Sequence, residues 1–206
     1  MVAQKGRPMY KIVVATKNNG KLLEIKNILE ELPVEVVSMV EDGIEIDIIE
    51  DGQTFEENAL KKARAVKKYT EAIVLADDSG LEVDMMGGAP GVFSSRFAGQ
   101  PFSDERNNAK LLSEMEGIEQ SKRTARFICI IAIIMPDGRE FCVRGECEGY
   151  VGTERKGNKG FGYDPLFSLP KYEKTMAELE PEIKNRISHR AKALEKLIIE
   201  LKKLLE

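Results

Sequence analysis

Histidine and cysteine are scarce in this sequence, and their scarcity excludes several kinds of site. His189 is the single histidine among 206 residues. A His-rich zinc site is therefore excluded, and a serine-histidine-acid triad would have to use this one residue. Three cysteines, Cys129, Cys142 and Cys147, form no CxxC pair, and their odd number argues against a disulfide framework. We therefore expect a reduced protein in the cytoplasm.

Long apolar runs and a large net charge are also missing. The longest apolar stretch, FICIIAIIM at 127–135, is too short to span a bilayer, and the N-terminus has no apolar signal core. The 31 basic and 35 acidic residues leave a net charge of -4, which favours neither nucleic acid nor an anionic membrane as a partner. We expect a soluble protein that is not exported, in which a local basic site must hold any polyanionic ligand.

The apolar pattern predicts one α/β domain with a mixed sheet. With 42% hydrophobic residues the chain can bury a real core, and no repeat or low-complexity linker divides it. Residues 1–8 show no periodicity and are expected to form a loose extension, which leaves 9–206 as the domain. Two strand-like runs joined at Asp137-Gly138 predict a hairpin. Three helices are expected at about 20–32, 104–115 and 181–205. A fourth is expected to begin near Thr54, which forms a capping-box pattern with Glu57.

Two adjacent carboxylates, Asp77 and Asp78, stand in the motif LADDSG. Adjacent ionised carboxylates repel each other, so a cation, hydrogen bonds or a proton must compensate them when they are partly buried. The alternative is a solvated turn at the end of a strand, where Asp, Ser and Gly are common. If the strand continues, its alternation sends the two side chains to opposite faces, and one of them faces the site.

Further acidic side chains precede this pair, at Glu50, Asp51, Glu56 and Glu57. Magnesium prefers oxygen ligands and needs only one or two carboxylates when substrate phosphate completes its shell. Not all of these residues can therefore be ligands, and Glu57 is also explained as a helix cap.

A possible phosphate loop lies between the first strand and the first helix. Its sequence is TKNNGK, comprising Thr16, Lys17, Asn18, Asn19, Gly20 and Lys21. Backbone N–H groups at a helix start, a hydroxyl and a lysine can together hold phosphate oxygens. The spacing is not that of a Walker motif. A plain Asn-Gly turn with a solvated lysine is the alternative.

Two later clusters combine glycines with basic or aromatic residues. GGAPGVFSSR at 87–96 allows close backbone approach, and its Arg96 can contact phosphate or a carboxylate; a purely structural loop is the alternative. In GFGYD at 160–164, Phe161 can stack on a base. Three basic side chains of KNRISHR are candidates for nucleotide contacts, and they are equally explained as a solvated helical face: Lys184, His189 and Arg190.

Five of these motifs occur in the order found in one known family. They are ATKNNGK, EDGQTFEENALKKA, LADDSGLEVDMMGGAPGVFSSRFAG, GNKGFGYDPLF and KNRISHRAKAL. From Tyr10 to Leu201 the chain resembles the non-canonical purine nucleoside triphosphate pyrophosphatases, often called inosine triphosphatases. The resemblance implies hydrolysis of ITP, dITP or XTP to the monophosphate and pyrophosphate with Mg2+, and leaves open whether Mn2+ replaces it. It also implies a mixed sheet flanked by helices, two lobes around a central nucleotide-binding cleft, and a homodimer.

The resemblance assigns roles to individual residues. Asp78 matches the general base and a metal ligand, and Glu50 matches a second metal ligand, although Asp51 occupies a position often held by threonine. Whether Asp77 or Asp51 also contacts metal stays open. The remaining matches are substrate contacts: the phosphate loop from Thr16 to Lys21, Ser79, the base-facing Phe161, Gly162, Tyr163 and Asp164, and the nucleotide contacts Lys184, His189 and Arg190.

Two rival functions remain at the level of sequence. A Maf-type pyrophosphatase would prefer other nucleotides, and the combined DDSG, GFGYD and SHR pattern argues against it. A nucleotide sensor would bind without turnover, and the intact acidic pair argues against that. Covalent catalysis is disfavoured because the serine of DSG does not stand in a GxSxG motif. The preferred substrate and the means of excluding GTP are not determined.

Overall fold

The computed structural model describes residues 10–205, which form two compact units. Within the described residues, unit 1 comprises 10–78, 130–143 and 194–205, and unit 2 comprises 79–129 and 144–193. The loose extension expected at 1–8 lies outside the described residues, and the prediction of a single domain stays a prediction. No helix in the described part of the chain has both the length and the apolar character needed to cross a membrane.

The described strands form one mixed sheet in the order β2-β1-β3-β4-β5-β6-β7. Strand β1 runs parallel to β2 and β3, whereas β6 runs antiparallel to β5 and β7. This confirms the predicted α/β class with a mixed sheet. The strands are β1 Tyr10–Val14, β2 Val34–Ser38, β3 Ile73–Val83, β4 Thr124–Ile134, β5 Glu140–Val151, β6 Phe167–Leu169 and β7 Lys174–Thr175.

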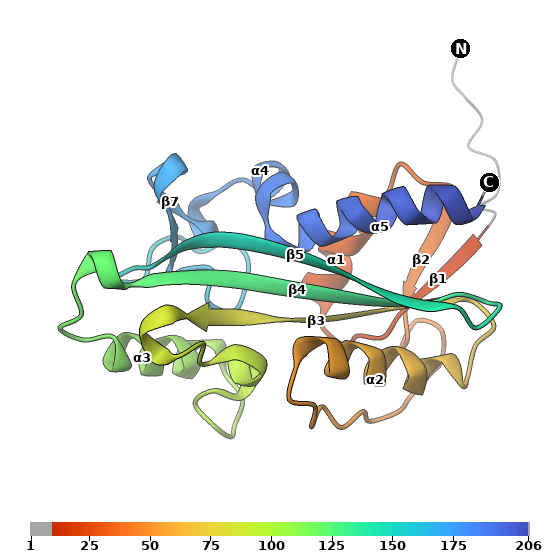
Figure 1. Cartoon of the computed structure of the whole chain (residues 1–206), viewed down its shortest axis with the longest axis horizontal. Coiled ribbons are helices and arrows are strands. Elements are labelled where there is room, and N and C mark those ends of the chain that lie inside the picture. The colour runs from red at the N-terminus through yellow and green to blue at the C-terminus, as the bar shows by residue number, and fades with distance from the viewer. Residues whose placement is uncertain (1–9, 206) are drawn as a thin grey trace, which may run out of the picture. The chain divides into compact units, whose positions relative to one another are not determined.

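Unit 1 places helices on both faces of its strands. Helix α1 (Asn19–Leu29) and helix α2 (Phe55–Lys67) lie on opposite sides of β1 and β3 (Figure 1). Ile12, Val13 and Val14 of β1 are fully buried and form an apolar run, as is usual for parallel strands that are covered on both faces. Thr54 caps α2 as predicted, with its hydroxyl accepting from the Glu57 N–H at 3.1 Å. The Glu57 carboxylate reaches back to the N–H of Gln53.

Unit 2 contains α3 (Asp104–Glu114) and α4 (Pro181–Ile187), together with five short 3-10 segments. Its core packs around Tyr163, Phe167 and Met176. The buried guanidinium of Arg123 donates to the carbonyl oxygens of Val151, Met115 and Gly152. The guanidinium thus satisfies carbonyl oxygens at the end of β5 and at the end of α3.

The LADDSG motif lies inside a strand and not at the end of one. Strand β3 runs without a break from Ile73 to Val83 and includes Asp77, Asp78 and Ser79. The interpretation of this motif as a solvated turn is therefore wrong. The apolar residues on both sides, which are buried, extend the strand through the polar ones.

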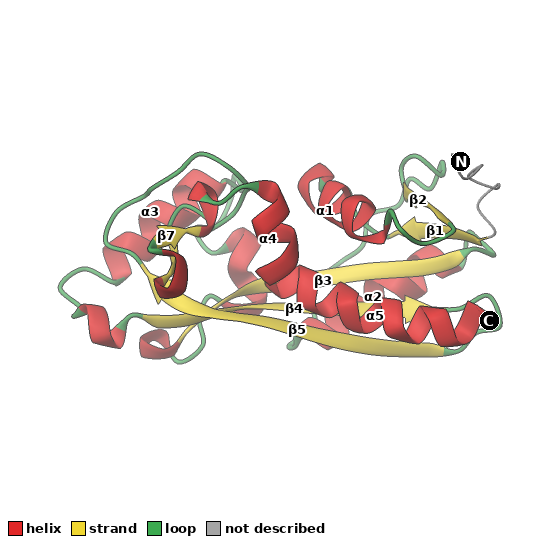
Figure 2. Ribbon diagram, turned by 90° about the horizontal axis from the view of Figure 1, so that it is seen from above, coloured by secondary structure: helices red, strands yellow, loops and turns green. Residues whose placement is uncertain are grey.

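The last helix was expected to be continuous from 181 to 205, and this is also wrong. Ser188 has φ -66° and ψ 159°, an extended conformation that ends α4. The Ser188 hydroxyl accepts from the N–H of Ala191 at 3.1 Å, as an N-cap residue does, and α5 begins at His189 and ends at Leu205. Figure 2 shows the two helices separately.

Gly145 in β5 lies against the backbone at the start of α5, so any side chain there would collide. A Cβ atom at this position would stand 2.1 Å from the His189 carbonyl oxygen and 2.4 Å from the Ala193 nitrogen. Gly145→Ala should therefore destabilise the protein by about 2 kcal/mol or more, and lower Tm by roughly 4–8 °C.

Thermal unfolding followed by circular dichroism tests this expectation. Gly152→Ala is the matched control, because a Cβ there meets nothing closer than 3.4 Å. Equal Tm values for the two variants would contradict the close packing of α5 on β5.

Candidate active site

The phosphate loop in unit 1 is shaped by its own side chains. The Thr16 hydroxyl accepts from the N–H of Asn18 at 3.0 Å, and the Asn18 side-chain oxygen Oδ1 accepts from the N–H of Lys21 at 3.0 Å. Asn18 is thereby the N-cap of α1, and the first turn of this helix contains no acidic residue. A helix start whose own first turn carries no acidic side chain favours binding of an anion.

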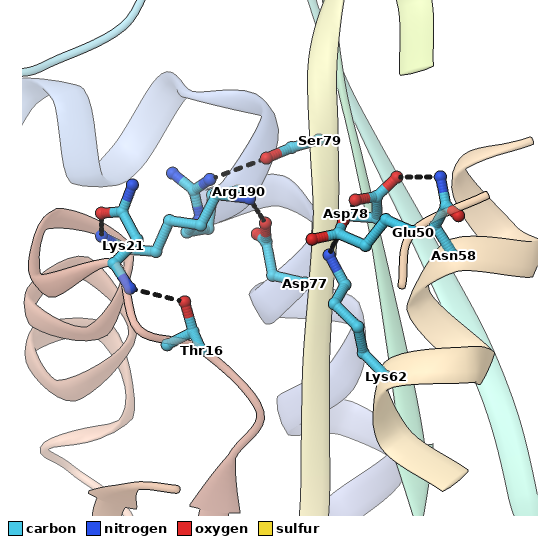
Figure 3. Close-up of polar contacts among 10 residues, drawn as sticks. Thr16, Lys21, Glu50, Asn58, Lys62, Asp77, Asp78, Ser79 and Arg190 are labelled. Carbon is cyan, nitrogen blue, oxygen red and sulfur yellow. Dashed lines mark hydrogen bonds and ion pairs between the residues drawn. The ribbon is translucent and has the colours of Figure 1, made fainter. Parts of the chain in front are cut away.

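The side chain of Lys21 extends from this loop to β3. Its ammonium group lies 2.5 Å from Asp77, whose side chain is fully buried (Figure 3). Lys17 instead pairs with the exposed Asp47 at 2.7 Å. The buried carboxylate of Asp77 therefore holds Lys21 in position, while Lys17 lies at the solvent surface.

Asp78 points away from Asp77, as strand alternation predicts, and faces helix α2. Lys62 of α2 brings its Nζ to 2.7 Å from Asp78 Oδ1 and 2.8 Å from Glu50 Oε2. The side chains of Lys62 and Asp78 are each only 9% exposed, whereas Glu50 is 39% exposed. Figure 3 shows both carboxylates converging on this one ammonium group.

In this arrangement the two carboxylates have different pKa values. Burial raises the pKa of Asp78 to about 6, although the neighbouring Lys62 acts in the opposite direction. Burial also pushes the pKa of Glu50 upward, but Lys62 outweighs burial and holds that pKa below its ordinary value. The more buried Asp78 is therefore the stronger base of the pair.

The loop that carries Glu50 is fixed to α2 by an asparagine. The side-chain oxygen Oδ1 of Asn58 accepts from the N–H of Gly52 at 2.8 Å, and the side-chain nitrogen Nδ2 lies 3.4 Å from Asp78 Oδ2. A Cβ at Gly52 would meet the Asn58 oxygen at 2.6 Å, so glycine permits this close approach. Asp51 instead forms an ion pair with Lys61 at the surface.

Glu50 and Asp78 fit a divalent cation that prefers oxygen ligands. Their oxygens already converge on one positively charged atom, Lys62 Nζ. Within residues 10–205, no three His, Cys, Asp or Glu side chains form a metal site by themselves. Two carboxylates nevertheless suffice for Mg2+ when water and substrate phosphates supply the other ligands.

Unit 2 contains the other predicted contacts. Ser79 follows Asp78 in β3, and its hydroxyl accepts from Arg190 Nη2 at 3.0 Å (Figure 3). Arg190 itself is only 1% exposed. Its guanidinium carbon also lies 5.7 Å from the centre of the Phe161 ring. A fixed guanidinium beside an aromatic ring is suited to binding a planar polar ligand.

Phe161 is partly exposed, and a buried ion pair lies beside it. Lys184 Nζ is 2.7 Å from Asp164 Oδ2 and 4.9 Å from the Phe161 ring centre. The same Asp164 oxygen accepts from the N–H of Phe161 at 3.0 Å. The break at Ser188 places Lys184 in α4, while His189 and Arg190 begin α5.

Three other predicted contacts lie in packed or surface positions. His189 stacks on Phe127, with ring centres 4.7 Å apart. Tyr163 is buried in the core, and its hydroxyl donates to the carbonyl oxygen of Ser94 at 2.8 Å. Arg96 lies 5.0 Å from the ring centre of the exposed Phe93. Their contacts with a nucleotide stay predictions.

Lys62 and Asn58 are two site residues that the sequence interpretation missed. Both are polar, yet they belong to the buried stripe of α2 with Ala59, Ala63 and Val66. A lysine or asparagine at a core-facing helical position normally needs a buried partner. Interruption of the apolar stripe at these two positions is the signal that could have found them.

Comparisons with known proteins agree with this arrangement of motifs. The model of the Ham1 family matches residues 12–200. Two bacterial relatives are named dITP/XTP pyrophosphatase. The one from Desulforamulus reducens is 53% identical over 94% of this chain and 96% of its own length. The one from Bacillus subtilis is 50% identical over 92% of this chain and 96% of its own.

A solved structure shares the fold over nearly the whole chain. It is that of a HAM1 protein from Coxiella burnetii, with a TM-score of 0.85 and 42% sequence identity, and the match covers 95% of this chain and all of the other. Because the family model and the relatives each match most of the residues, the chain belongs to the Ham1 family.

Proposed function

We propose that this chain hydrolyses the non-canonical nucleotides dITP, XTP and ITP to the monophosphate and pyrophosphate, and so removes them from the nucleotide pool. The observation that carries the proposal is the 53% identity, over 94% of the chain, to a protein named dITP/XTP pyrophosphatase. We further propose that the protein acts in the cytoplasm as a homodimer, without nucleic acid or membrane partners.

The acidic pair would hold the metal ion. Glu50 and Asp78 would bind Mg2+, and Mn2+ would suit the same oxygen ligands. When bound, such an ion neutralises phosphate charge and lowers the pKa of a coordinated water. Lys62, already between the two carboxylates, supports this assignment because it keeps both ionised oxygens directed at one point.

Asp78 would act as the general base. As water attacks the α-phosphorus, the Asp78 carboxylate would take the proton from that water. Lys21 and the N–H groups at the start of α1 would hold the phosphates of the departing pyrophosphate. Asp77 keeps the Lys21 ammonium group directed into this region through its 2.5 Å contact. Asp77 would thus position a phosphate-binding lysine and would not bind the metal.

Recognition of the base would depend on residues of unit 2. Phe161 would stack on the purine, and donors at Arg190 or His189 would favour the 6-oxo group over the 6-amino group of adenine. Placing the 6-amino group of adenine against these buried donors leaves both sides without an acceptor. Each such mismatch costs roughly 1–3 kcal/mol, or about 5- to 150-fold in discrimination against adenine. The buried, fixed position of Arg190 supports this role.

Product identification tests the proposal directly. Pure protein is incubated with Mg2+ and, separately, ITP, XTP, dITP, dTTP, UTP, ATP or GTP, and both products are identified. Monophosphate and pyrophosphate from ITP, XTP or dITP support it. Turnover mainly of dTTP or UTP favours a Maf-type enzyme, binding without products favours a sensor, and nucleoside diphosphate with free phosphate refutes cleavage at the α-phosphorus.

Removing the stacking ring should weaken substrate binding. Phe161→Ala is expected to raise KM for ITP roughly tenfold with a smaller change in kcat, because stacking contributes about 1–3 kcal/mol per base. Phe102→Ala is the matched control, since Phe102 is an exposed phenylalanine in the same unit. Steady-state kinetics with an unchanged KM for Phe161→Ala would argue against stacking.

A further inference from the structure

The turn that carries Phe161 needs support from outside itself. Gly160 has φ +76° and Gly162 has φ +60°, so a glycine with a left-handed backbone stands on each side of the aromatic residue. Glycine loses more conformational freedom on ordering than any other residue. Asp164 holds the N–H of Phe161, and further contacts are needed to fix Gly162 on the other side of the ring.

Two residues of α3 hold both sides of Gly162. The N–H of Gly162 donates to Asp104 Oδ2 at 2.7 Å, and its carbonyl oxygen accepts from Asn108 Nδ2 at 2.8 Å. Asp104 and Asn108 are four positions apart, so they lie on one face of the helix. Asn108 also donates to the Asp104 carbonyl oxygen at 2.6 Å and is only 1% exposed.

Asn107, which precedes Asn108 in the same helix, fixes a second loop. Asn107 accepts from the N–H of Ala98 at 2.8 Å and donates to the carbonyl oxygen of Ser95 at 3.1 Å. Tyr163 donates to the neighbouring Ser94 carbonyl oxygen at 2.8 Å. Helix α3 therefore connects the turn at Phe161 to a loop that is itself hydrogen-bonded, and provides a rigid support.

We propose that Asp104 and Asn108 are positioning residues that hold the Phe161 ring ready to stack on the purine base. The inference rests on the proposed function and extends it to residues that touch no substrate. Holding the ring in its binding orientation beforehand removes the ordering cost at the moment of binding. Loss of this support should therefore affect KM more than kcat.

Asp104→Ala is the first test, because Asp104 is exposed and its loss leaves the Gly162 N–H accessible to water. KM for ITP is expected to rise about 3- to 10-fold with kcat within about twofold, the range for losing one solvent-accessible hydrogen bond of ordinary strength. Asp104→Asn retains an oxygen acceptor and should restore KM to within about twofold of the wild type.

Glu105→Ala is the matched control for charge at the start of α3. It removes the adjacent first-turn carboxylate, which pairs with Arg155 at 3.8 Å, and it leaves the turn at Phe161 untouched. Its KM should equal that of the wild type. Tm is measured for every variant, so that an unfolded variant is recognised. Asn108→Ser is a second variant, which removes the hydrogen bond to the Gly162 carbonyl oxygen.

A double-mutant cycle decides whether Asp104 acts through the ring. In a Phe161→Ala background, Asp104→Ala should raise KM no further, because no ring remains to be positioned. Additive effects, or an unchanged KM for both Asp104→Ala and Asn108→Ser in an active, folded enzyme, would overturn the inference while leaving the proposed function intact. Failure of the wild type to release pyrophosphate from ITP, XTP or dITP would instead overturn both.

Discussion

Asp78→Asn is expected to lower kcat for ITP by about 10²- to 10⁴-fold, because it removes the carboxylate that takes the proton from the attacking water. Asparagine has nearly the same shape, and Asn58 and Lys62 still surround the position. Nucleotide affinity, measured by calorimetry, should change much less than kcat. The variant therefore separates binding from chemistry.

Asp51→Asn is the matched control for this variant. Asp51 follows Glu50 in the same loop, but its carboxylate is 65% exposed and pairs with Lys61. Its kcat should stay near that of the wild type. If Asp78→Asn also retained near-normal kcat, Asp78 would lose its proposed role as the base.

Lys62→Met should destabilise the protein strongly in the absence of divalent cations. The substitution leaves Asp78, which is buried, facing Glu50 without the ammonium group that contacts both carboxylates. Removing one partner of a buried ion pair costs about 3–5 kcal/mol, and the partial exposure of Glu50 places this case near the lower value. Tm should fall by roughly 6–12 °C.

Mg2+ should recover much of this loss, since a divalent ion between the two carboxylates replaces the missing positive charge. The rise in Tm on adding Mg2+ should therefore be larger for Lys62→Met than for the wild type. Lys61→Met is the matched control, because it removes an adjacent but more exposed lysine of α2. A rise no larger than that of the wild type would contradict metal binding by Glu50 and Asp78.

Local patterns in the sequence were sufficient for most elements of the fold. The spacing of apolar residues predicted α1, the helix expected at 104–115 is present as α3, and Thr54 marked the start of α2. The two runs around Asp137-Gly138 appear as β4 and β5. Each of these signals depends on neighbours within about four residues, which is the range over which helix caps and tight turns act.

Two errors arose where a local signal favoured a wrong boundary. Ser-Gly after Asp78 suggested a turn, yet β3 continues because the residues that follow are buried in the core. Ser188 looked like an ordinary position inside a helix, yet it ends α4 and caps α5. Both choices depend on packing against distant segments, which propensity does not contain.

By itself, the sequence determined the α/β class, the family resemblance and the acidic and basic residues expected to act, because these follow from residue type, order and short-range spacing. Only the tertiary structure decided which charged and hydrogen-bonding groups meet. It paired Asp77 with Lys21, Asp78 and Glu50 with Lys62, and Gly162 with Asp104 and Asn108. These partners are 12 to 58 positions apart in the chain, and long-range packing, which no local pattern encodes, brings them together.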